Sequence, residues 1–63
     1  MNERKLLGKR KEVGLTQEQI AKEMGINPAT YNLKEQGKRE FTASELVKLC
    51  KILNVDINYF FEK

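Results

Sequence analysis

Four helix starts recur along the chain, and they constrain its fold more than any other feature. Each consists of a residue that caps a helix N-terminus, with an apolar residue directly before it and another four positions after it. Such an apolar pair, a hydrophobic staple, fixes the direction in which the chain enters the helix. The four caps are Thr16, Asn27, Thr42 and Asp56. The sequence therefore predicts several short, separately capped helices.

The predicted helices also have matching ends. Gly14, Gly25 and Gly37 stand where a left-handed residue would end the preceding helix, and Asn54 can serve the same purpose. No strand alternation is found, and the cap spacing is too irregular for a repeat architecture. We therefore predict an all-α fold, a compact bundle of five helices. The expected helices span about residues 3–13, 17–24, 28–36, 43–53 and 57–61.

Length and composition narrow the function classes. A chain of 63 residues has room for one small domain, so we expect a single domain over residues 1–63. Histidine is absent and cysteine occurs once, so we expect no enzyme activity, metal, cofactor or small-molecule substrate. No apolar run approaches the roughly 20 residues that cross a bilayer, and we expect a cytoplasmic protein without membrane association. The net charge of +3, concentrated in the N-terminal part, favours a polyanionic partner.

Only three residues, 25–27, separate the second and third predicted helices. A turn this short makes two helices meet at a steep angle, which predicts a helix-turn-helix over about residues 17–36. At 100° per residue, helix 28–36 turns small or uncharged residues outward. These are Ala29, Thr30, Asn32, Leu33 and Gln36. An outer face without acids, followed by Lys38 and Arg39, fits the major groove of duplex DNA, while a merely solvated helix is the alternative.

Two opposite charges fall on inward faces of the predicted helices. Arg10 shares the apolar stripe of the first helix with Leu6 and Val13. Glu35 follows the inward-facing Tyr31 by one turn. We expect Arg10 to pair with Glu35, and the alternative is that both side chains reach outward to solvent or phosphate. Breaking such a buried pair strands one charge, at a cost of about 3–5 kcal/mol.

The C-terminal third carries more apolar residues than one small core obviously requires. The expected buried face of helix 43–53 comprises Leu46, Leu49, Cys50 and Leu53. Val47, Ile52 and Ile57 lie off that face. They indicate either a dimer interface or a widened core with singly exposed apolar residues.

A family resemblance covers nearly the whole chain. It rests on the stretch LTQEQIAKEMGINPATYNLKEQGKR and on residues outside it: Arg10, Leu46, Leu49, Leu53 and the closing Val55-Asp56-Ile57. Together these residues resemble the phage repressor and Cro type of helix-turn-helix, also called the Xre family. The resemblance implies a lambda-repressor-like, DNA-binding domain that represses or regulates transcription in a phage or bacterium. It further implies a homodimer, at least on DNA, bound to a palindromic operator in double-stranded DNA.

The resemblance also assigns roles to individual residues. With the other outward-facing residues of helix 28–36, the base-facing set comprises Pro28, Ala29, Thr30, Asn32, Leu33 and Gln36. The phosphate-contacting set comprises Gln17, Lys38 and Arg39 from the resemblance, and we add Lys34 because its long side chain can bring the ammonium to a phosphate. Gln17 looks like the glutamine that contacts phosphate and braces the recognition helix; the alternative is that it only supports the start of its own helix. Arg10 and Glu35 match the buried ion pair of the family.

Two departures from the family pattern affect base reading. Pro28 and Ala29 offer no side-chain hydrogen bond, so Asn32 becomes the main polar reader, with Ala29 and Leu33 available to thymine methyl groups. Position 34 is usually apolar in the family and is Lys34 here. Either its stem covers the core edge while its ammonium reaches phosphate, or the helix is slightly rotated.

A second function is compatible with the same fold. The domain would then be a protein-interaction module, such as an antitoxin or a docking regulator, that uses the apolar C-terminal surface around Val47 and Ile52. Salt dependence separates the two functions, because only phosphate binding falls steeply and log-linearly with salt. A small hydrolase is not expected, since Ser44, Thr30 and Cys50 have no histidine to activate them.

Overall fold

The computed structural model describes residues 1–62, which fold into four α-helices and one 3-10 helix. Their bounds are α1 Glu3–Val13, α2 Gln17–Met24, α3 Pro28–Glu35, α4 Ala43–Leu53 and η1 Ile57–Phe60. No strand occurs in this part of the chain, so the all-α prediction is confirmed. Two ends differ by one residue from the sequence prediction. Gln36 is the cap that follows α3 and leads into Gly37, and the last element is a single 3-10 turn ending at Phe60.

Local hydrogen bonds explain why the helices begin where they do. The Thr16 hydroxyl accepts the N–H of Gln19, whose side chain in turn accepts the N–H of Thr16. Thr42 and Glu45 form the same reciprocal capping box at the start of α4. The Asn27 side chain accepts a backbone N–H two residues later, at 2.7 Å. Each such cap stabilises its helix by about 1 kcal/mol.

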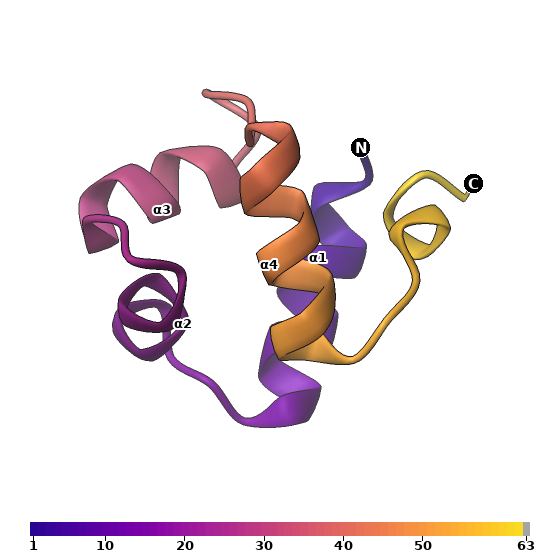
Figure 1. Ribbon diagram of the computed structural model, residues 1–63, viewed down its shortest axis with the longest axis horizontal. Coiled ribbons are helices and arrows are strands. Elements are labelled where there is room, and N and C mark those ends of the chain that lie inside the picture. Colours follow the sequence, from indigo (N-terminus) through magenta and orange to yellow (C-terminus); the bar gives the residue numbers. More distant parts are fainter. Residues whose placement is uncertain (63) are drawn as a thin grey trace.

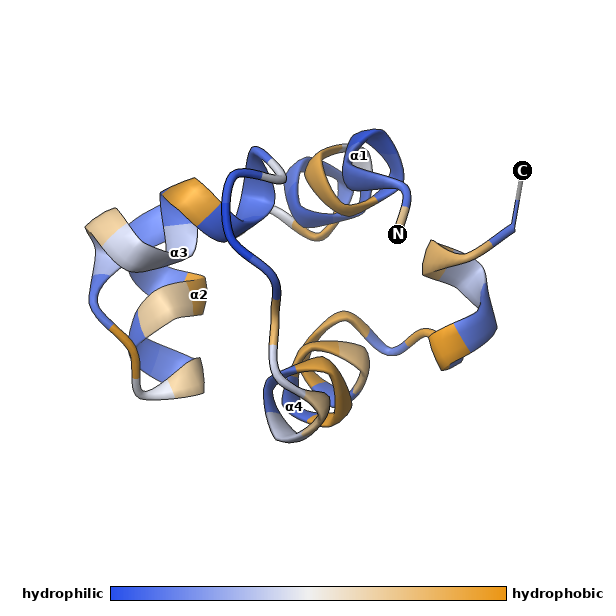
Figure 2. Ribbon diagram, turned by 90° about the horizontal axis from the view of Figure 1, so that it is seen from above, coloured by the Kyte–Doolittle hydropathy of each residue, from blue (hydrophilic) through white to orange (hydrophobic). Residues whose placement is uncertain are grey.

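The helices enclose one core. Figure 2 shows α1 and α4 on opposite sides of it, with α2 and α3 closing one end and η1 the other. The core contains Leu6, Ile20, Ala21, Met24, Tyr31, Leu49, Leu53 and Phe60. The two ends of the chain lie on the same side of the molecule (Figure 1), where the backbone N–H of Asn2 donates to the carbonyl of Phe60 at 2.6 Å.

Some apolar residues do not lie where helix periodicity placed them. Val13 shares a face with Leu6 but is 46% exposed, because α1 ends there and the chain turns away toward α2. In α4, Leu46 and Cys50 are only half-buried, and Ile52 also packs against the core, so the buried face is broader than predicted. Burial raises the pKa of the Cys50 thiol, which favours a packing role over a reactive one. No helix among residues 1–62 has both the length and the hydropathy needed to cross a bilayer.

Candidate nucleic-acid interface

A three-residue turn joins α2 to α3. Gly25 ends α2 with φ +74°, a left-handed conformation that costs most residues about 1 kcal/mol. The N–H of Ile26 then bonds back to the carbonyl of Ala21, and Asn27 caps α3. In Figure 1, α2 is seen nearly end-on while α3 runs across the view, so the two helices are steeply inclined. The turn therefore produces helix-turn-helix geometry.

The helix α3 has two chemically different faces. Its inner face buries Tyr31, Lys34 and Glu35. Its outer face comprises the exposed Pro28, Ala29 and Gln36 and the half-buried Thr30, Asn32 and Leu33. None of these outer residues is acidic, so the face presents no charge that would repel a phosphate backbone.

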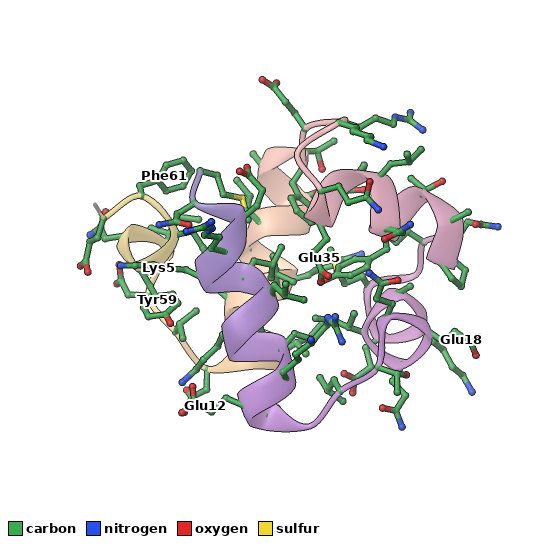
Figure 3. The ribbon with its side chains drawn as sticks, turned by 180° about the vertical axis from the view of Figure 1, so that it is seen from behind. Lys5, Glu12, Glu18, Glu35, Tyr59 and Phe61 are labelled. Atoms are coloured by element: carbon green, nitrogen blue, oxygen red, sulfur yellow. The ribbon has the colours of Figure 1, made fainter. Side chains whose placement is uncertain are left out.

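The inner face is anchored to α1 by an ion pair. Arg10 Nε donates to Glu35 Oε2 at 2.8 Å and Arg10 Nη2 to Glu35 Oε1 at 3.1 Å, with 9% and 5% of the two side chains exposed. The structure thus places together the two charges expected from helix periodicity, and Figure 3 shows Glu35 between α1 and α3. Arg10 Nη1 also donates to the carbonyl of Leu15 at 2.8 Å. The phenol of Tyr31 donates a further hydrogen bond to Glu35 Oε2 at 2.6 Å, a contact not predicted from the sequence.

Protonation states follow from these contacts. Burial raises the pKa of Glu35, but hydrogen bonds from Arg10, Tyr31 and Gln17 outweigh it, so the net pKa lies below its ordinary value. The bond to Glu35 raises the pKa of Arg10 despite its burial. Burial, and then the Glu35 carboxylate, raise the pKa of Tyr31. At neutral pH the site therefore holds a charged carboxylate, a charged guanidinium and a neutral phenol.

Gln17 connects this ion pair to the outer face of α3. Its Nε2 donates to Glu35 Oε1 at 3.1 Å and to Asn32 Oδ1 at 2.9 Å. The Nε2 of Gln36 donates to the same Asn32 oxygen at 3.0 Å. In this structure both N–H donors of the Gln17 side chain are used within the protein, which favours the role of bracing the recognition helix α3. The four-residue spacing of Asn32 and Gln36 was the one sequence signal for this amide cluster.

Lys34 does not lie on the outer face. Only 8% of the residue is exposed, its ammonium pairs with Glu45 of α4, and it lies 5.9 Å from the centre of the Phe41 ring. The stem does cover the core, as one sequence alternative proposed. However, the ammonium pairs with Glu45 between α3 and α4, so Lys34 does not reach outward to a phosphate in this structure.

Free cations lie on both sides of the outer face. Lys38 and Arg39 are exposed in the loop after α3, which Figure 2 shows as strongly hydrophilic, and neither forms an ion pair with a described residue. Arg4 and Lys11 of α1 line a shallow cleft that also contains Asn32. Both are exposed and have no ion-pair partner among residues 1–62. These two cations were not among the residues predicted from the sequence, although their seven-residue spacing puts them on one face of α1.

Comparison with known proteins agrees with this geometry. A helix-turn-helix family model matches residues 6–60, which include all of α2, α3, α4 and η1 and most of α1. No curated protein and no solved structure matches the chain. The matched family consists of Cro-like regulators that bind double-stranded DNA. Because the model covers most of the sequence, the chain belongs to the Cro-like (Xre) helix-turn-helix family of DNA-binding regulators.

Proposed function

We propose that this chain is a sequence-specific transcriptional repressor of phage or bacterial type that inserts α3 into the major groove. One observation carries the proposal: the outer face of α3 has no acidic residue, and cations without an ion-pair partner among residues 1–62 lie on both sides of it. A major groove is wide enough for an α-helix, and each base pair presents a distinct pattern of donors and acceptors there. The arrangement suits base reading by α3 and phosphate contacts around it.

The phosphate contacts are assigned to the exposed cations. Lys38 and Arg39 neutralise phosphates beyond the C-terminal end of α3, and Arg4 and Lys11 do so along α1. The side chain of Gln17 positions α3 through its hydrogen bonds to Asn32 and Glu35. The backbone N–H of Gln17, at the start of α2, is available to a phosphate. These contacts set the register of the protein on DNA but carry no sequence information.

The base contacts are assigned to the outer face of α3. Asn32 is its central polar side chain, and Ala29 and Leu33 offer apolar contacts to thymine methyl groups. Thr30 and Gln36 border this centre. Pro28 has no side-chain donor or acceptor, so it contributes only shape.

A homodimer of single domains, each spanning residues 1–63, completes the proposal. Three large apolar side chains of α4 and the C-terminal segment are exposed: Val47 by 53%, Ile57 by 39% and Phe61 by 54%. A two-fold dimer would bind two half-sites about one helical turn, or roughly 10 bp, apart.

Selection of bound sequences from random duplex DNA tests the proposal. A palindrome with half-sites about one helical turn apart is the expected result. Absence of any enriched sequence would contradict specific DNA binding. A single isolated half-site would contradict only the dimeric arrangement.

The exposed apolar residues also support a second candidate, a protein-interaction module. Val47→Asp separates the two roles, with Ser44→Asp as a control that adds the same charge to the exposed side of α4. The repressor proposal expects Val47→Asp to weaken binding to the palindrome while sparing a single half-site. A protein-interaction module without DNA recognition would instead lack the salt-sensitive duplex binding that phosphate contacts produce.

A further inference from the structure

We infer that the buried ion pair of Arg10 and Glu35 fixes the hydrogen-bond direction of Asn32, so that Asn32 reads a base only as a donor. The base that satisfies such a reader carries acceptors on its major-groove edge, and guanine fits best. This inference deepens the proposed function and rests on it, because it requires α3 to lie in the major groove.

The direction of these hydrogen bonds is set first by the Glu35 carboxylate. An ionised carboxylate can only accept hydrogen bonds, and Arg10 keeps Glu35 ionised through two bonds of 2.8 and 3.1 Å. Gln17 must therefore turn its NH2 group, not its oxygen, toward Glu35 Oε1. The nitrogen lies 3.1 Å from that oxygen. The orientation of this amide is thus dictated by chemistry rather than by local packing.

The second hydrogen of the same amide sets the orientation of Asn32. Gln17 Nε2 lies 2.9 Å from Asn32 Oδ1, so the group that faces it must be an acceptor. Gln36 Nε2, four residues further along the chain, donates to the same oxygen at 3.0 Å. A carbonyl oxygen has two lone pairs, and both are now used. The acceptor half of Asn32 is occupied inside the protein.

The donor half of Asn32 stays free. Its Nδ2 donates to no group among residues 1–62, and the half-buried side chain lines the cleft beside the outer face of α3. A free asparagine recognises adenine by accepting from N6 and donating to N7. Here the acceptor is taken, so the N6 amino group of adenine lacks a partner. Guanine presents two acceptors, O6 and N7, and thymine presents only one, O4, whereas cytosine presents an amino donor and is rejected.

The first test measures base preference at one operator position. That position is the one whose preference disappears in Asn32→Ala, and duplexes with each of the four base pairs there are titrated. Wild type is expected to bind guanine over adenine on the order of tenfold. Gln17→Met and Gln36→Met each free one lone pair of the Asn32 oxygen, so each should lower the guanine-to-adenine ratio severalfold. Glu23→Met, at an exposed position of α2, is the control and should leave the ratio unchanged.

Two results would overturn the inference. One is a wild-type preference for adenine, cytosine or thymine at that position. The other is an unchanged guanine-to-adenine ratio in both methionine variants. Gln36→Met changes an exposed residue that does not touch Glu35, so it remains informative even if Gln17→Met fails to fold.

The second test measures the free protein and, read together with operator binding, separates this inference from the proposed function. In NMR spectra of the free protein, both side-chain amide protons of Gln17 should exchange slowly with solvent, and those of Asn32 should exchange fast. Fast exchange at Gln17 in a protein that binds a specific operator would overturn the inference alone. Slow exchange at Gln17 without any specific DNA binding would overturn the proposed function, and the reading role of Asn32 with it.

Discussion

Replacing Arg10 by methionine should cost more stability than any other single change in the outer face of α3 or the residues that support it. Methionine is an unbranched apolar side chain that leaves the Glu35 carboxylate buried, with only the hydrogen bonds from Tyr31 and Gln17. It also removes the donor to the carbonyl of Leu15. Because the Glu35 side chain is only 5% exposed, water cannot replace the lost guanidinium.

The expected magnitude is about 3–5 kcal/mol, the usual cost of stranding one partner of a buried pair. A domain of 63 residues has a total unfolding free energy of roughly 3–9 kcal/mol, so Arg10→Met should be barely folded at 25 °C. With a urea m-value of about 1 kcal/mol/M, the unfolding midpoint should fall by about 3 M or more. Glu35→Gln should also destabilise, because it leaves the guanidinium without its carboxylate.

Urea unfolding of the two single variants and the double variant forms the assay. The double variant Arg10→Met/Glu35→Gln should lose clearly less than the sum of the single losses, since neither charge remains stranded. Simple additivity would refute the claim that the two residues support each other. Because a barely folded variant has no measurable folded baseline, the series is measured in a stabilising osmolyte.

Four further outcomes follow from single contacts. The pKa of Glu35 is lowered on folding, so its contribution to stability is complete above the ordinary value of 4.5 and is lost as pH falls from there through the folded pKa; Glu35→Gln should flatten this acid dependence in thermal melts. Gly25→Ala meets no atom within 4 Å but keeps φ +74°, so calorimetry should show a loss of about 1 kcal/mol from the backbone alone. Lys34→Met should cost about 1.5 kcal/mol in urea unfolding, less than Arg10→Met, because Glu45 keeps its bond to the capping backbone. Lys38→Ala should weaken binding to all duplexes and make the salt dependence shallower by about one unit, as titrations at several salt concentrations would show.

The helices were predictable because their signals are local. Thr16 and Thr42 each satisfy a backbone N–H three residues away, and Asn27 does so within two, so a short window of sequence contains both partners. The ion pair of Arg10 with Glu35 was predictable for a different reason. Two independent helix periodicities pointed two opposite charges inward, and a buried charge requires a partner.

Contacts that depend on how helices meet were not predictable. The partner of Lys34 is Glu45, whose side chain arrives from α4 while serving a capping box, and nothing near Lys34 in sequence indicates this. The same holds for the bond from Gln17 to Asn32, which spans two helices. Val13 was predicted to be buried but is exposed, because periodicity gives the face of a helix but not whether a neighbour covers its end.

The most direct test of the central claim, that the outer face of α3 reads bases, is titration of Asn32→Ala against the selected operator and a random duplex. Asn32 lies on the acid-free face and has a free donor group. We expect a loss of about 1–3 kcal/mol in binding free energy on the operator and little change on random DNA. An equal loss on both duplexes would contradict base reading through Asn32 and the orientation of α3 proposed above.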